Sequence, residues 1–130
     1  MCCLFGIVDH QRRFNAKEKT HILSVLATAC EERGTDATGI AYCSDYHLSI
    51  YKRPLEAHRL RFRVPEDSSV IMGHTRMTTQ GRANRNRNNH PFLGDTNGER
   101  FALAHNGIIW NDRILRRSRH LPKTKIETDR

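Results

Sequence analysis

The chain has 130 residues, and its 22 Lys and Arg against 14 Asp and Glu leave a net charge of +8 at pH 7. This length suits one domain with a single hydrophobic core. No apolar run approaches the ~18 residues of a membrane-spanning helix, and the start of the chain lacks a signal-peptide pattern. These features predict a cytoplasmic protein without membrane contact, although the basic balance leaves nucleic acid open as a partner.

The four cysteines do not form a metal-binding pattern. Cys2 and Cys3 are adjacent, Cys30 and Cys43 stand alone, and no pair of Cys or His residues has the spacing of a zinc site. We therefore expect reduced thiols, no structural metal and no cofactor.

The first predicted elements are a strand and a long helix. The apolar run Cys3–Asp9 is typical of a strand. Asn15 is followed three residues later by Glu18, which is the capping-box pattern of a helix start. Apolar residues then recur at helical spacing until the stop signal Gly34, which predicts a helix over Ala16–Arg33. The apolar stripe of this helix comprises Ile22, Leu23, Leu26, Ala27 and Cys30.

The rest of the chain predicts mainly strands. Gly39–Cys43 and His47–Arg53 flank a short polar break, as in a hairpin. The other predicted elements are a strand over Val70–Arg76, a strand over Phe101–His105 continued by Ile108–Trp110, and a short basic helix over Asp112–Ser118.

Two basic segments allow more than one interpretation. Arg59, Arg61 and Arg63 alternate with apolar residues, which in a strand places the three guanidinium groups on one face. That face is either solvated or binds an anion. Met77–Asn89 is a long loop rich in Asn and Arg, and it is either a lid or a basic segment that tolerates nucleic acid.

Cys2 has the position of an N-terminal nucleophile. Removal of Met1 would leave Cys2 with a thiol and a free α-amine on the same residue. The amine titrates near ~7.7–8.0, so a part of it can accept a proton at neutral pH. The thiolate is the nucleophilic form of cysteine. The alternative is that Cys2 is simply a small, buried hydrophobic residue.

Polar residues at the ends of two predicted strands offer complementary chemistry. Arg76 ends one strand with a planar donor fork that suits a carboxylate. Asn106 and Gly107 follow the other strand, and they could supply a side-chain amide and a backbone N–H to an oxyanion. Asn-Gly is also a strong turn signal.

Short motifs recur in a fixed order along the chain. They are Met1–Ile7, Arg33–Ala41 with the pattern Arg-Gly-x-Asp-x-x-Gly, Gly73–Gly81, His90-Pro91, His105–Gly107 and Glu127–Asp129. Together they resemble the class II glutamine amidotransferases, whose nucleophile is the processed N-terminal cysteine. The resemblance covers the whole chain.

The resemblance implies a catalytic role for three residues. Cys2 would attack the side-chain amide of glutamine with its own α-amine as the base. Asn106 and Gly107 would stabilise the tetrahedral oxyanion, in which loss of one donor typically costs about a hundred- to a thousand-fold in rate.

The resemblance also implies how L-glutamine is held. Arg76 would bind its α-carboxylate, Asp129 its α-ammonium, and Thr79 would line the pocket. Ammonia would then pass to an acceptor on a synthase domain or a separate partner, which the sequence does not identify.

Several residues depart from the family pattern. Cys3 stands where glycine is usual, and at a period of two it points away from Cys2. Its role is left open, with a core neighbour preferred over a second nucleophile. Met77 and Gln80 replace the Trp and His of the aminosugar-forming branch, which argues against that branch. Arg130 replaces the usual Ser or Thr.

The expected fold is α+β, the four-layer αββα sandwich of N-terminal-nucleophile hydrolases, incomplete at the C-terminus. Residues 1–130 would be the N-terminal part of one glutamine amidotransferase domain, with Asp129 poorly supported near the chain end. The expected function is glutamine hydrolysis. The alternatives are a small basic nucleic-acid-binding module, which lacks a known nucleic-acid motif, and an inactive fragment of the enzyme.

Overall fold

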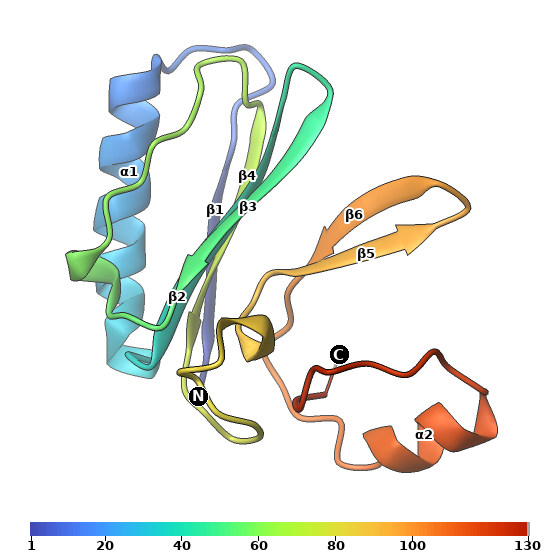
Figure 1. Cartoon of the computed structure of the whole chain (residues 1–130). Coiled ribbons are helices and arrows are strands. Elements are labelled where there is room, and N and C mark those ends of the chain that lie inside the picture. The colour runs from blue at the N-terminus through green and yellow to red at the C-terminus, as the bar shows by residue number, and fades with distance from the viewer. Residues whose placement is uncertain (130) are drawn as a thin grey trace.

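The computed structural model describes residues 1–129 as an α+β fold, and Arg130 lies outside the described residues. Two sheets are present in this part of the chain: a four-stranded antiparallel sheet in the order β1-β4-β2-β3, and the hairpin β5-β6 (Figure 1). The elements are β1 (Cys3–Val8), α1 (Ala16–Ala29), β2 (Ala37–Ser44), β3 (His47–Arg53), β4 (Val70–Arg76), β5 (Phe92–Thr96), β6 (Glu99–Leu103) and α2 (Asp112–Ser118).

The capping box predicted for α1 is confirmed. The Asn15 side chain accepts a hydrogen bond from the Glu18 N–H (2.9 Å), and the Glu18 carboxylate accepts one from the Asn15 N–H (2.8 Å). Helix α1 ends at Ala29, and a 3₁₀ turn over Cys30–Arg33 follows it directly. The predicted helix therefore has the correct extent, but its last turn is 3₁₀ and not α-helical.

The hydrophobic core lies between α1 and one face of the four-stranded sheet. Figure 1 shows α1 lying along this face, with the hairpin β5-β6 on the other side of the sheet. The buried core residues come from α1, from three strands and from the segment after β3. They are Ile7, Leu23, Ala27, Ile40, Ala57, Leu60, Phe62, Val64 and Ile71.

A buried ion pair ties the start of α1 to the end of β1. Lys19 is fully buried although lysine is usually exposed, and its Nζ lies 3.3 Å from Asp9 Oδ2. The Lys19 ammonium also donates to the carbonyls of Glu66 (2.6 Å) and Ser68 (2.8 Å), so its charge is well satisfied. Burial opposes ionisation of Asp9, but N–H donors of Arg13 and Phe14 and the Lys19 charge hold its pKa below the usual value.

Two predicted strand segments need correction, and one strand was missed. Ala57–Arg59 is a 3₁₀ turn and residues 60–64 are not in a sheet, yet the predicted alternation holds because Leu60, Phe62 and Val64 are buried while the three arginines are exposed. The strand predicted to run through Ile108–Trp110 ends at Leu103, since the Asn-Gly pair turns the chain away. The hairpin partner β5 was not predicted.

The sheet register divides the chemistry between two faces. Cys3 pairs with Thr75 and Ile7 pairs with Ile71, and directly paired residues share a face, here the one covered by α1. His74 and Arg76 alternate with these residues and therefore lie on the opposite face, as does Cys2, which precedes Cys3. Within residues 1–129, no helix is long and apolar enough to cross a membrane.

Candidate active site

Cys2 lies at the start of β1 beside the backbone that follows β4. Its half-buried thiol is 3.5 Å from the Met77 carbonyl oxygen, and the Met77 N–H donates to the Cys2 sulfur at 3.4 Å. The Cys2 sulfur is therefore positioned by two backbone groups of the same residue, Met77. With Met1 in place the α-amine belongs to Met1, where it donates to the Met77 sulfur at 2.8 Å.

The motif at Arg33–Ala41 holds this backbone in place. A side chain at Gly34 would come within 2.5 Å of the Arg76 carbonyl carbon, so only glycine allows the two segments to approach this closely. The Asp36 N–H donates to the Arg76 carbonyl (2.9 Å), and the Asp36 carboxylate accepts from the Thr78 N–H (2.7 Å). Gly34 and Asp36 thus fix the turn that presents Arg76 and Met77.

Arg76 is a buried cation on the same face of the sheet as Cys2. Only 3% of it is exposed, and its guanidinium donates to the Asn89 side-chain oxygen (2.7 Å) and to the Gln80 carbonyl. Burial lowers the pKa of Arg76, while the charges of Cys2, Asp36 and Asp129 act in the opposite direction. The charges of Cys2 and Asp129 therefore both act on Arg76. The guanidinium has five N–H groups, so it can also donate to a further anion.

Asp129 is held firmly, in contrast to the expectation that it would be poorly supported. Only 2% of it is exposed. Its carboxylate accepts hydrogen bonds from the Ile109 N–H and from the Thr128 hydroxyl (3.1 Å), and its carbonyl oxygen lies 3.3 Å from His105 Nε2. The Asp129 carboxylate also lies 3.8 Å from His105 Nε2 and acts on the charge of Arg76, and a buried carboxylate is suited to an ammonium group.

The Asn- and Arg-rich loop is built into the protein, so it is neither a free lid nor a loose basic segment. Asn88 and Asn89 are fully buried. Asn88 accepts from the Glu127 N–H (2.9 Å) and donates to the Glu127 carboxylate (2.9 Å) and to the Arg82 carbonyl (3.0 Å). Arg85 forms an ion pair with Glu127, and the Asn88 hydrogen bond together with the Arg85 charge holds the pKa of Glu127 below its usual value.

This loop is the part of the site that sequence reasoning missed. Through Asn89 it holds Arg76, and through Asn88 it holds the segment that ends in Asp129. The available signal was the run of Asn residues directly before His90-Pro91, since asparagine both donates and accepts and so can bridge two backbones.

The other three assigned residues are exposed. Asn106 and Gly107 lie in the segment between β6 and α2, and Thr79 lies in the turn after β4. None of the three takes part in a hydrogen bond within residues 1–129. The structure therefore brings together Cys2, Arg76 and Asp129, and leaves the proposed oxyanion donors free.

The chain is similar over most of its length to much longer enzymes. It is 34% identical over 119 residues to a glutamine–fructose-6-phosphate aminotransferase (isomerizing) of Bacillus thuringiensis, a match that covers 90% of this chain. It is 36% identical over 114 residues, or 85% of this chain, to the enzyme of the same name from Staphylococcus aureus. The chain spans 18% of the length of each relative. No family model and no solved structure matches it significantly.

These relatives agree with the family that the ordered motifs indicate. The chain belongs to the class II glutamine amidotransferases. Met77 and Gln80 argued against the aminosugar-forming branch, yet the matched relatives carry the name of fructose-6-phosphate aminotransferases.

For this amidotransferase chain, Asn88→Ala is expected to weaken glutamine binding more than it slows turnover. The change removes the hydrogen bonds that Asn88 makes to Glu127. These bonds position the segment that ends in Asp129. If the free energy of glutamine binding falls by about 1–2 kcal/mol, KM rises by roughly 5- to 30-fold. Steady-state glutaminase kinetics measure the effect. Asn84→Ala is the matched control, because Asn84 is exposed in the same loop and its side chain has no hydrogen bond within residues 1–129.

Three histidines form a cluster beside Arg76. His74 Nε2 lies 3.2 Å from the His105 carbonyl oxygen and 3.1 Å from His90 Nδ1. Because a carbonyl can only accept, His74 Nε2 carries its proton. Burial, followed by the neighbouring histidines and Arg76, lowers the pKa of His90 to about 2. Burial, with the charges of His105 and Arg76, lowers the pKa of His74 to about 4 despite its bond to His105.

These buried histidines are expected to make the fold acid-sensitive below pH 6.5. A histidine with a lowered folded pKa is protonated first in the unfolded chain, so stability is full above pH 6.5 and falls as the pH drops towards 4. For His74 alone, the free energy of unfolding at pH 5 is expected to be roughly 2 kcal/mol lower than at neutral pH. Urea unfolding at pH 7.5 and 5.0 measures it, and His74→Gln should flatten the dependence while the exposed His10→Gln should not. An unchanged unfolding midpoint between the two pH values would contradict this.

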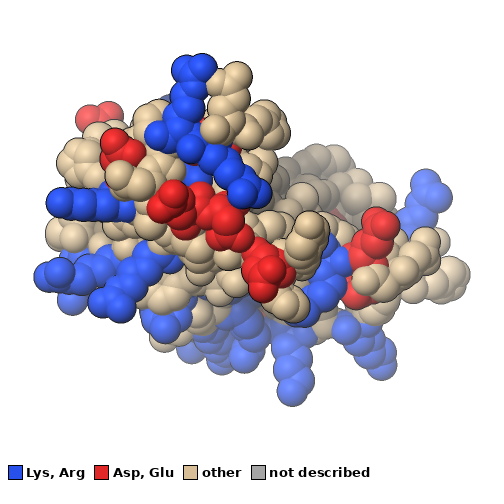
Figure 2. All heavy atoms as spheres, turned by 90° about the horizontal axis from the view of Figure 1, so that it is seen from above, with Lys and Arg blue, Asp and Glu red and all other residues tan. Residues whose placement is uncertain are grey.

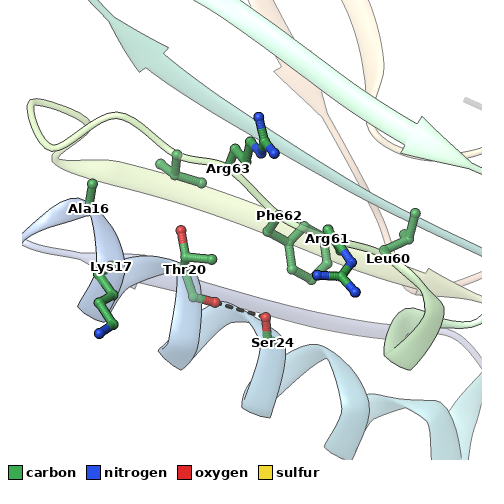
Figure 3. Close-up of a pocket in the computed structure, with 9 residues that line it drawn as sticks. Ala16, Lys17, Thr20, Ser24, Leu60, Arg61, Phe62 and Arg63 are labelled. Atoms are coloured by element: carbon green, nitrogen blue, oxygen red, sulfur yellow. Dashed lines mark hydrogen bonds between the residues drawn. The ribbon is translucent and has the colours of Figure 1, made fainter.

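The basic residues Arg59, Arg61 and Arg63 lie away from the site, in different surroundings. Arg61 and Arg63 line a hollow of about 490 Å³ with Lys17 of α1, on the face of the sheet opposite to Cys2 (Figure 3). Arg59 is paired with Glu56 at 3.2 Å. On the face that Figure 2 shows, acidic side chains lie among the basic ones. This distribution favours a solvated surface over a nucleic-acid track.

The described residues do not offer a metal centre. No group of three or more His, Cys, Asp or Glu side chains within residues 1–129 is arranged to hold a metal ion.

Proposed function

We propose that this chain carries the glutaminase reaction of a class II amidotransferase. The observation that carries the proposal is that the charges of Cys2 and of the buried Asp129 both act on the buried guanidinium of Arg76. Free L-glutamine has a matching set of groups: a carboxylate for Arg76, an ammonium for Asp129 and an amide for the Cys2 sulfur.

In this reaction the Cys2 thiolate attacks the carbonyl carbon of the glutamine side chain. The C–O double bond becomes an oxyanion, for which Asn106 and Gly107 supply the donors once substrate draws them in. As the C–N bond breaks, the α-amine of Cys2, freed by removal of Met1, returns the thiol proton to the leaving ammonia. Water then hydrolyses the thioester to glutamate and restores the thiol.

The family supports a matching proposal for the domain. Residues 1–130 form the N-terminal part of a glutamine amidotransferase domain of αββα architecture, and α1 is one of its outer helical layers. Ammonia then passes to an acceptor on a synthase domain or on a separate partner. The names of the relatives favour a sugar phosphate as that acceptor.

A labelling experiment tests the proposal on the chain as it is. The purified protein is checked by mass spectrometry for loss of Met1 and incubated with a diazoketone analogue of glutamine. We expect one adduct, on Cys2, that excess glutamine prevents, together with release of ammonia and glutamate from glutamine. Cys43 is the internal control, because it is exposed and remote in sequence. Equal labelling of Cys43, or labelling without any glutamine hydrolysis, would overturn the proposal.

A further inference from the structure

Two cysteines outside the proposed reaction lie in direct contact. The sulfur atoms of Cys3 and Cys30 are 2.9 Å apart, and both residues are half-buried free thiols. The other two cysteines differ from this pair: Cys2 contacts the Met77 backbone, and Cys43 is exposed. The contact joins residues that are 27 positions apart in the sequence.

Both thiols are carried by backbone that is hydrogen-bonded to other elements. Cys3 begins β1 and pairs with Thr75 of β4. Cys30 caps the end of α1, where its N–H donates to the carbonyls of Leu26 and Thr28, and its own carbonyl accepts from the Thr75 hydroxyl at 3.0 Å. Thr75 thus links the two cysteines from a third element. Reaching the ~2.05 Å of a disulfide requires the sulfur atoms to close by roughly 0.9 Å, which small side-chain rotations can supply.

We propose that Cys3 and Cys30 are an oxidative modification site, at which a small-molecule disulfide of the glutathione class converts the pair to an intramolecular disulfide. The Cys3 thiolate attacks one sulfur of the small disulfide, which gives a mixed disulfide and releases one small thiol. Cys30 then loses its proton to solvent and attacks the Cys3 sulfur, which releases the second small thiol. In total, two protein thiols are oxidised and one small disulfide is reduced to two thiols.

The electrostatics of the pair are consistent with this order of attack. Burial, followed by the hydrogen bond to Cys3 and the Cys3 charge, raises the pKa of Cys30 to about 12, so Cys30 is a neutral thiol at physiological pH. Once Cys3 is part of a mixed disulfide, its charge and its hydrogen bond no longer raise the pKa of Cys30. Arg33 acts in the other direction and lowers this pKa. The second step therefore becomes easier only after the first.

The bond would tie the residue next to Cys2 to the end of α1. It would also close a loop through β1 and α1, which reduces the freedom of the unfolded chain and raises the melting temperature. The inference does not depend on glutamine hydrolysis, because its readout is the covalent state of Cys3 and Cys30.

Peptide mapping of the full chain tests the proposal. The reduced protein is incubated at neutral pH with glutathione disulfide, the remaining thiols are blocked, and the chain is cleaved with trypsin without reduction. We expect peptides 1–12 and 20–33 to be joined with the loss of two hydrogens. Because peptide 1–12 contains both Cys2 and Cys3, the Cys2→Ser variant decides which one is bonded.

The variants give a defined pattern. The joined peptide and an upward shift of the melting temperature should persist in Cys2→Ser and Cys43→Ser, and should be lost completely in Cys3→Ser and Cys30→Ser. Circular dichroism confirms that each variant is folded. Joined peptides that survive in Cys3→Ser, a bond from Cys30 to Cys2, or mixed adducts of glutathione alone would each overturn the proposal.

Discussion

Replacing Cys2 with serine is expected to abolish glutamine hydrolysis. The Cys2 sulfur accepts the Met77 N–H, and after removal of Met1 it would share its residue with the α-amine that acts as the base. A serine hydroxyl is a far weaker nucleophile at neutral pH, so we expect the rate to fall by roughly a thousand-fold or more. Because serine is nearly isosteric with cysteine and Cys2 is only half-buried, the fold should be unaffected.

Two other cysteine variants serve as controls for Cys2→Ser. Cys3→Ala should retain most of the activity, because the Cys3 side chain lies on the face of the sheet that α1 covers. Cys43→Ser changes an exposed thiol and should have no effect. A coupled assay for glutamate measures all three. An equal loss in Cys2→Ser and Cys3→Ala would show that the nucleophile has been assigned to the wrong cysteine.

The free α-amine can be tested separately from the thiol. A chain in which Met1 is retained keeps the Cys2 thiol but places its nitrogen in a peptide bond, where it cannot accept a proton. We expect that form to be as inactive as Cys2→Ser. Intact-mass measurement shows which form is present, and full activity with Met1 retained would exclude the α-amine as the base.

Replacing Arg76 with alanine is expected to raise the KM for glutamine by roughly 10- to 100-fold, because a charge-assisted pair with a carboxylate is worth about 1.5–3 kcal/mol. Inhibition by glutamate should weaken by a similar factor, since both ligands carry the same α-carboxylate. Turnover should change less, because Arg76 is assigned to binding and does not contact the reacting amide.

Arg76 also supports the structure through Asn89 and Gln80, so stability has to be measured alongside kinetics. Arg76→Lys keeps the charge but loses the planar fork, and we expect it to recover stability more fully than affinity. Arg61→Ala removes an exposed arginine on the opposite face of the sheet and is the matched control. A KM in Arg76→Ala equal to that of Arg61→Ala would remove Arg76 from the binding role.

Local patterns in the sequence determined most of the secondary structure and pointed to Cys2 and Arg76 as candidates, whereas Asp129 was a candidate only through the family resemblance. The capping box at Asn15, the hairpin before Arg53 and the strand that ends at Arg76 are each encoded within a few consecutive residues. Such signals act before the chain is folded, because they depend on the spacing of apolar groups and on caps made within one turn.

Contacts between distant segments were decided only by the tertiary structure. The pairing of Asn88 with Glu127 joins residues 39 positions apart, and that of Cys3 with Cys30 joins residues 27 apart. Lys19 is a surface residue by type, and it is buried only because Asp9 and two carbonyl groups surround its charge. The residue type states which hydrogen bonds a polar side chain can make, and only the folded chain decides whether water or another segment makes them.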